Sequence, residues 1–192
     1  MLKYKKTSKL SDHKQSHPKL KLQVRNFGEQ SRVSVGEIVA LLDRLPAHHL
    51  GQLKEIIYDP RRIILQLIDD PMLDLNRNSK GMFIQNRRTI AIFDFDDKTQ
   101  LFHILMHELA HHVYYVIIDS TVKKRWVTEV CREAPFITPY ASRNASEDFA
   151  ESYAKFVLEP EKLRNIPIKY NFILREIFKG VSPNRDSLDV TF

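Results

Sequence analysis

The segment His107–His111 holds the residues best suited to chemistry, in the order His-Glu-Leu-Ala-His. Two histidines four residues apart on a helix project from the same face, so both imidazoles can bind one metal ion. Glu108 faces the open side of such a metal, where its carboxylate can take a proton from a bound water. We therefore predict that His107 and His111 are metal ligands and that Glu108 is a general base.

A catalytic zinc ion needs three protein ligands and one open position for water, so a second helix should supply a third ligand. The acidic run at residues 147–151 (Glu-Asp-Phe-Ala-Glu) is the candidate. Glu147 and Glu151 are four residues apart and share a helical face, whereas Asp148 points about 100° away. We predict Glu147 as the third ligand and Glu151 as the hydrogen-bond partner of a ligating histidine. The alternatives are a plain capping role for Glu147 and Asp148 as the ligand.

The other histidines are less suited to metal binding. His103 lies one turn before His107 on the same stripe, but three ligands on a single helix cannot surround a metal. We expect His103 to line the site or to pack in the core. His112 is expected to pack or to face solvent, and His48 and His49 are expected to be structural.

Both groups of residues require rigid helices. Asp97 is the expected N-cap of the first helix, with Gln100 as its capping-box partner. Apolar residues then recur at helical spacing at Leu101, Phe102, Leu105, Leu109 and Val113. Asn144 with Glu147 predicts a second capping box, and the helix that it opens should run to Glu159.

Strands and further helices are expected around these two helices. The patterning predicts strands over residues 20–24, 53–58, 62–68, 82–85 and 88–95. The last two strands should form a hairpin, while Ser34 and Ser120 should open helices and a final helix should cover 166–178. The expected fold class is α+β, with a small mixed or antiparallel sheet packed on the motif helix and a mostly helical C-terminal half.

Length and charge divide the chain into a tail and one domain. The 192 residues, 43% of them hydrophobic, suit a single globular domain, which we place at residues 19–192. Residues 1–25 carry eight lysines or arginines against the single acid Asp12, a net charge of +7, while the whole chain has +6. The basic charge therefore belongs to the N-terminus, and we expect residues 1–18 to form a flexible tail.

The sequence patterns that the chain lacks indicate its expected location and partners. The sequence has no apolar run of the roughly 18–20 residues that a membrane span requires, and its first residues show no signal-peptide pattern. Cys131 is the single cysteine, which favours a reducing environment. A cytoplasmic location is expected, with delivery outside the cell left open. No recognition motif accompanies the basic tail, so a peptide or protein substrate is expected rather than a specific nucleic acid.

The segment 139–151 resembles the catalytic domain of anthrax-lethal-factor-like zinc peptidases, a group that includes the small Pro-Pro endopeptidases. In that group a tyrosine precedes an Asn-x-x-Glu-x-Phe-Ala-Glu helix by a short loop. The resemblance implies a zincin-like fold with Glu147 as a zinc ligand, Glu151 behind a ligating histidine and Tyr140 assisting catalysis across the cleft. It covers roughly residues 45–160 and does not extend to the loops that select the substrate.

A second resemblance concerns the same helix. The pattern Glu-x-x-Ala-x-x-Tyr-Ala over residues 147–154 is similar to bacterial regulatory metallopeptidases that cleave repressors. This resemblance also implies Glu147 as a zinc ligand, but it gives no role to Tyr140. The place of Tyr140 in the first pattern favours the lethal-factor-like group.

The expected function is that of an endopeptidase with one Zn²⁺ per chain. Zinc would activate a water, Glu108 would act as general base and Tyr140 would stabilise the oxyanion. The substrate should pair with an edge strand, for which residues 88–95 are the candidate, unless they form an ordinary core strand. The alternatives are a non-catalytic zinc-binding interaction protein and a nucleic-acid-associated protein that acts through its tail.

Overall fold

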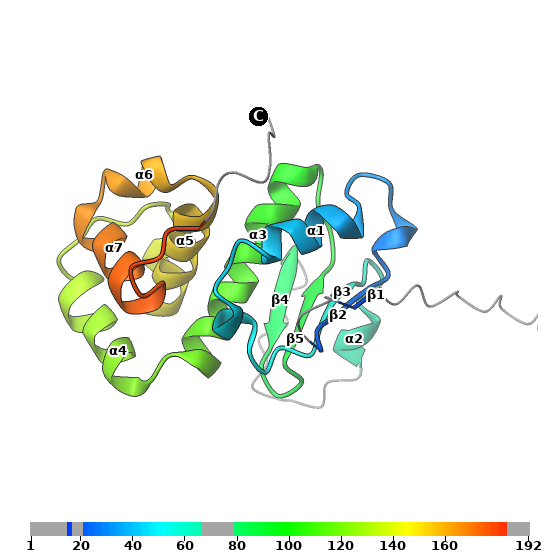
Figure 1. The fold of residues 1–192 in the computed structure, drawn as a ribbon, viewed down its shortest axis with the longest axis horizontal. Coiled ribbons are helices and arrows are strands. Elements are labelled where there is room, and N and C mark those ends of the chain that lie inside the picture. Colours follow the sequence, from blue (N-terminus) through cyan, green and yellow to red (C-terminus); the bar gives the residue numbers. More distant parts are fainter. Residues whose placement is uncertain (1–14, 17–20, 67–78, 184–192) are drawn as a thin grey trace, which may run out of the picture.

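Five short strands form one mixed sheet in the order β1-β2-β3-β5-β4 (Figure 1). The computed structural model describes residues 15–16, 21–66 and 79–183. The strands are β1 (Gln15–Ser16), β2 (Gln23–Arg25), β3 (Glu55–Tyr58), β4 (Gly81–Ile84) and β5 (Thr89–Ile92). Strands β2, β3 and β5 run parallel, whereas β1 and β4 are antiparallel to their neighbours. The predicted α+β class with a small mixed sheet is confirmed.

The hairpin of β4 and β5 is confirmed, and of the two roles expected for its second strand the structure shows the ordinary core strand rather than the edge strand. Ile84 pairs with Thr89, and Arg88 closes the turn with a left-handed φ of 56°. Strand β5 lies between β3 and β4 and is buried along its whole length, so residues 88–95 do not provide an edge. The edge strand beside the motif helix is β4, because β5 also pairs with β3 and is enclosed on both sides.

The prediction of a strand over residues 62–68 is wrong within the described part of the chain. Ile63–Gln66 form the short helix α2, and residues 67–68 lie outside the described ranges. The carboxylate of Asp59 accepts a hydrogen bond from the Ile64 N–H at 2.8 Å, and the Arg62 N–H donates to the Asp59 carbonyl. These local hydrogen bonds turn the chain and start a helix, although the Ile-rich composition favours a strand.

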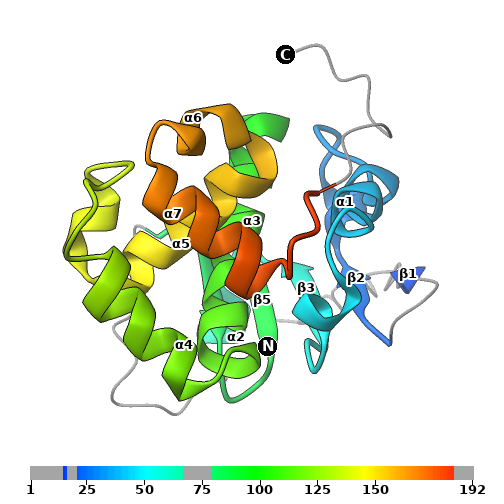
Figure 2. The same cartoon turned by 60° about the vertical axis from the view of Figure 1, so that its left-hand side comes forward.

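Helix α3 (Lys98–His112) carries the motif and occupies the centre of the fold. It lies between the sheet on one side and the C-terminal helices on the other (Figures 1 and 2). Asp97 is its N-cap, as predicted, and accepts from the Gln100 N–H at 2.8 Å. The Gln100 side chain does not complete the capping box, because it accepts from the Asp96 N–H instead. A π-helical turn, Val113–Ile117, continues α3.

The remaining elements are also helical, and the sequence predicts all of them except the short helix that begins at Pro160. They are α1 (Val35–Leu42), α4 (Ser120–Arg125), α5 (Ala145–Leu158), α6 (Pro160–Arg164) and α7 (Pro167–Phe172). Ser34 caps α1 with a complete capping box, whereas α4 is capped by Asp119 rather than by the predicted Ser120. The final helix continues through a π-helical turn, Ile173–Ile177, which agrees with the predicted range of 166–178.

One large apolar core joins the sheet, α1, α3 and the C-terminal helices. Ile90 and Ile92 of β5 face this core, while Ala91 faces a smaller cluster with Ile64 of α2. None of the helices formed by the described residues is long and apolar enough to cross a membrane. The tail predicted over residues 1–18 lies outside the described ranges, except for the two residues of β1.

Candidate metal centre

Helices α3 and α5 pack against each other and present the predicted ligands to one another. His107 and His111 lie on successive turns of α3, and Glu147 lies in the first turn of α5. The Asn144 side chain caps α5 by accepting from the N–H groups of Ser146 and Glu147. The Glu147 side chain reaches across to α3 rather than returning to the cap, so the predicted capping box of Asn144 and Glu147 is only half formed.

Three ligand atoms converge on one point. The Nε2 atoms of His107 and His111 are 3.1 Å apart. Glu147 Oε2 lies 3.1 Å from the first and 3.4 Å from the second. The structure thus brings together the three side chains that the sequence predicts as ligands.

The two imidazole nitrogens and the carboxylate oxygen favour a positive charge in the space between them. Glu147 Oε2 is buried and has no hydrogen-bond partner among the described residues, although it faces both imidazoles. Burial favours the neutral form of His107, yet the contacts with Glu147 and Glu151 outweigh it and raise its pKa to about 10. Burial likewise favours neutral Glu147, but the two histidines lower the pKa of this carboxyl to about 2. A proton or a metal cation in the space between the three atoms would compensate this carboxylate.

The spacing and the donor types suit zinc. Ligand atoms about 2.0–2.1 Å from a tetrahedral zinc ion lie roughly 3.3 Å from one another. The three observed separations range from 3.1 to 3.4 Å. Two imidazoles and one carboxylate are a donor set of catalytic zinc sites, which leave the fourth position open.

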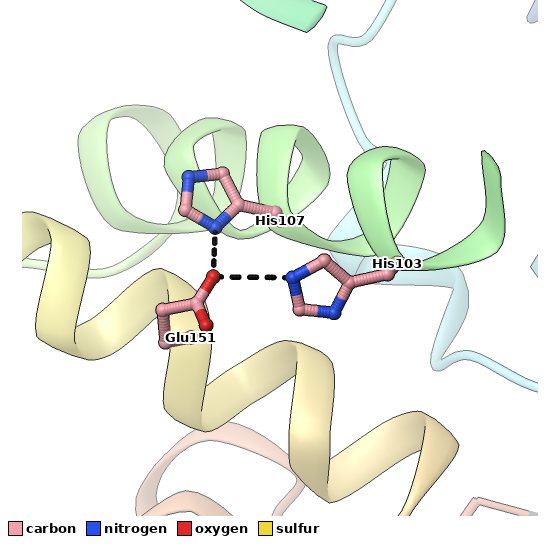
Figure 3. Close-up of side chains that lie close together, drawn as sticks. All are labelled: His103, His107 and Glu151. Atoms are coloured by element: carbon pink, nitrogen blue, oxygen red, sulfur yellow. Dashed lines mark hydrogen bonds and ion pairs between the residues drawn. The ribbon is translucent and has the colours of Figure 1, made fainter. Parts of the chain in front are cut away.

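A second cluster of possible ligands, shown in Figure 3, serves another purpose. Glu151 Oε1 lies 2.8 Å from His107 Nδ1 and 3.2 Å from His103 Nε2. This oxygen accepts from His107 Nδ1, and His103 Nε2 lies within reach as a second donor. The hydrogen bond with Glu151 places the proton of His107 on Nδ1 and turns the Nε2 lone pair toward Glu147 and His111.

Glu108 lies beside the cluster and is held by the edge strand. Its Oε2 accepts a hydrogen bond from the backbone N–H of Phe83 in β4 at 2.8 Å. The close approach of α3 to β4 depends on Gly81, where an added Cβ would lie 2.5 Å from Ile104 Cγ2 and 3.1 Å from Glu108 Cγ. Sequence reasoning missed Gly81 and Phe83, because neither belongs to a motif and their contacts arise only when β4 packs on α3.

Tyr140 lies at the rim of the cluster. It begins a 3₁₀ turn, Tyr140–Arg143, directly before α5, and its ring centre is 5.6 Å from that of His107. The side chain is 41% exposed, and the Arg143 guanidinium lies over the ring at 4.2 Å. Partial burial and the nearby carboxylates of Glu147 and Glu108 raise its pKa, so the phenol keeps its proton at neutral pH. The hydroxyl can therefore act as a hydrogen-bond donor.

The remaining candidates lie away from the cluster. Asp148, the alternative ligand, is fully buried and forms an ion pair with Lys169. His112 bonds the Gly51 carbonyl and is buried, so of its two expected roles it has the packing one. His49 is a buried structural residue, as predicted.

One aromatic residue at the site was not found from the sequence. Tyr115 stacks on His111 with a ring separation of 6.1 Å and is 43% exposed. The sequence could have indicated this contact, because Tyr115 follows His111 by four residues and would lie on the same helical face. Tyr115, which follows α3, therefore lies beside His111, and Tyr140, which precedes α5, lies beside His107.

Comparisons of the chain with known protein families, with curated proteins and with solved structures find no match. The geometry of the site is therefore the basis for its interpretation.

Proposed function

We propose that this chain is a zinc-dependent endopeptidase with a zincin-like fold, whose single Zn²⁺ is held by His107, His111 and Glu147. The observation that carries the proposal is the buried Glu147 Oε2, which lacks a hydrogen-bond partner among the described residues and lies within 3.4 Å of both imidazole Nε2 atoms. An acid beside this cluster and a phenol at its rim complete the set of groups that peptide hydrolysis requires.

Glu108 would move the proton. A zinc ion held here would supply a water of lowered pKa, about 7, and would polarise the substrate carbonyl. The Phe83 N–H holds Glu108 Oε2, which leaves Oε1 to accept the proton of the attacking water. Glu108 would then pass that proton to the leaving amine, so one carboxylate serves as base and as acid.

Tyr140 would stabilise the oxyanion that forms on the substrate. Its ring centre lies 5.6 Å from that of His107, and its protonated hydroxyl could donate as negative charge develops. Losing such a donor typically costs about 3–4 kcal/mol of transition-state stabilisation. The position of Tyr140 next to His107 also supports the lethal-factor-like resemblance over the repressor-cleaving one, which gives this residue no role.

The substrate would be an extended peptide that pairs with β4. The Phe83 N–H points away from β5 and toward Glu108, so the outer edge of β4 borders the catalytic groups. Because the Phe83 N–H is already bonded to Glu108, a peptide added along this edge would pair with the other outward-facing backbone groups of β4, beside the cluster. The strand-pairing role that the sequence suggested for residues 88–95 thus passes to β4.

Zinc content tests the proposal. The wild type should contain about one zinc per chain by elemental analysis, and Glu147→Ala should lose most of it. Glu133→Ala removes an exposed carboxylate elsewhere and should keep the metal. A wild type that takes up no zinc after reconstitution would refute the proposal. Zinc binding without cleavage of any peptide would favour the non-catalytic alternative.

A further inference from the structure

We propose that His103 is a positioning residue of the metal centre, which holds the Glu151 carboxylate in the orientation that fixes His107. This inference rests on the zinc site of the proposed function, but it concerns the affinity and geometry of that site rather than peptide cleavage. The sequence suggested only that His103 lines the site or packs in the core.

Figure 3 shows one carboxylate oxygen shared between two imidazoles of α3. Glu151 Oε1 lies 2.8 Å from His107 Nδ1 and 3.2 Å from His103 Nε2. The two histidines are four residues apart on α3, so they approach Glu151 from adjacent turns. Glu151 is thus held from two directions.

Burial makes the second donor necessary. The Glu151 side chain is only 5% exposed, so water cannot replace a missing donor. With His107 alone, the carboxylate would remain a largely uncompensated buried charge and could rotate about its own side-chain bonds. His103, whose side chain is 33% exposed, adds a donor from the solvent side.

The hydrogen bond with Glu151 orients His107, whereas His111 has no comparable partner among the described residues. His111 Nδ1 is buried and has no hydrogen-bond partner among the described residues, so no acceptor behind it fixes its ring. The orientation of the ligand pair is therefore set through His107 and Glu151. Partners behind a ligating histidine typically change metal affinity by about 10–100-fold.

His103 is not itself placed to bind the same ion. Its ring centre is 6.3 Å from that of His107, and Glu151 Oε1 contacts both rings. The His103 Nε2 is directed at this oxygen rather than at Glu147. Its effect on the metal must therefore pass through Glu151.

Two substitutions of His103 separate a hydrogen-bonding role from a packing role. His103→Leu removes the donor and retains apolar bulk, whereas the amide of His103→Gln can still donate to Glu151. His48→Leu is the control, because His48 is an exposed histidine on the Ala47–Leu50 turn. Thermal unfolding of each metal-free variant verifies that the chain folds.

The readouts are the zinc dissociation constant, from competition with a chelating dye, and the visible spectrum of the Co²⁺-substituted protein. We expect His103→Leu to weaken zinc binding about 10–100-fold and to shift the Co²⁺ bands. His103→Gln should bind within roughly threefold of the wild type, and His48→Leu should be unchanged.

Zinc affinity and a Co²⁺ spectrum unchanged in His103→Leu would overturn the inference. Equal weakening in His103→Leu and His103→Gln would also overturn it, because packing would then explain the effect. If the wild type binds zinc in a His103-dependent way but cleaves no peptide, the peptidase proposal fails and this inference stands. If the wild type binds no zinc, both fail.

Discussion

Glu108 and Phe83 are joined by a hydrogen bond of 2.8 Å from the Phe83 backbone N–H to Glu108 Oε2. The bond links the motif helix to the edge strand and fixes one oxygen of the carboxylate next to the candidate metal centre. It also separates the positioning of Glu108 from its chemistry, because a neutral amide could accept the same hydrogen bond.

Glu108→Gln should therefore keep the fold and the zinc while losing cleavage. The amide oxygen can accept from Phe83, but the side chain cannot take up a proton from water. We expect kcat to fall at least about 10²–10⁴-fold, with zinc per chain unchanged by elemental analysis. Full activity in this variant would contradict the assignment of Glu108 as general base.

Gly81→Ala should displace Glu108, although Gly81 is not itself a proposed catalytic residue. The new methyl would lie 2.5 Å from Ile104 Cγ2 and 3.1 Å from Glu108 Cγ, so α3 and β4 must separate. We expect a loss of about 1–3 kcal/mol in the free energy of unfolding, measured by urea denaturation, together with a lower kcat.

Gly36→Ala is the matched control for this change. Within 4 Å its methyl would meet Ser34 Oγ alone, at 3.8 Å, and Gly36 lies in α1. Alanine is favoured over glycine in helices, so stability should stay the same or rise by up to about 1 kcal/mol. Equal effects of the two substitutions would show that Gly81 has no special role in the approach of α3 to β4.

Tyr140→Phe should lower kcat without releasing zinc. The ring can keep its contact with His107, but the donor to the oxyanion is lost. The expected decrease is about 10²–10³-fold in kcat, with a smaller change in KM. Tyr115→Phe removes a hydroxyl from the other exposed tyrosine at the site and should have a much smaller effect on kcat. A reversed order of the two effects would assign the oxyanion role to Tyr115.

His49 should make the protein less stable in mild acid. Its imidazole is buried between the Tyr153 hydroxyl and the Ile177 carbonyl, and burial lowers its pKa to about 4. The unfolded chain has a histidine pKa near 6.5, so it takes up the proton first as the pH falls. The contribution of His49 to the free energy of unfolding should therefore fall between about pH 6.5 and pH 4, by about 3 kcal/mol, and be constant above this window.

Urea denaturation across this pH range checks the prediction. His49→Gln removes the titrating group and should reduce the pH dependence, whereas His48→Gln, at an exposed position, should leave it intact. Some dependence should remain in His49→Gln, because burial also lowers the pKa of His112 to about 4. An unchanged slope in His49→Gln would show that His49 does not titrate in this way.

Local sequence signals predicted the parts of the fold that local interactions decide. The N-caps Ser34, Asp97 and Asn144 act on residues within one helical turn, and all three cap helices as predicted. The histidine spacing likewise fixes a helical face, so the sequence predicts that His107 and His111 lie together. That Glu147 reaches this pair depends on the packing of α5 on α3; the sequence predicted Glu147 from the three ligands that catalytic zinc needs and from the resemblance, not from periodicity.

Features set by strand order and by distant contacts could not be read in this way. Thr89–Ile92 is buried because β3 pairs on one side and β4 on the other, and nothing in its own sequence states which strands flank it. The role of His103 depends on Glu151, which lies on another helix. The pairing of Asp148 with Lys169 depends in turn on how α7 packs on α5.

Asp148 and Lys169 form an ion pair from which solvent is fully excluded, one residue beyond the proposed ligand Glu147. Lys169→Met should cost about 3–5 kcal/mol in the free energy of unfolding, because it leaves the Asp148 carboxylate buried without a cation. The double variant Asp148→Leu, Lys169→Met replaces both charges by apolar groups and should recover most of this loss. Urea denaturation of both variants measures the effect, and elemental analysis of the double variant should still give about one zinc per chain. Loss of zinc from a stable double variant would instead assign Asp148 to the metal, although among the described residues it belongs to neither group of side chains that could hold one.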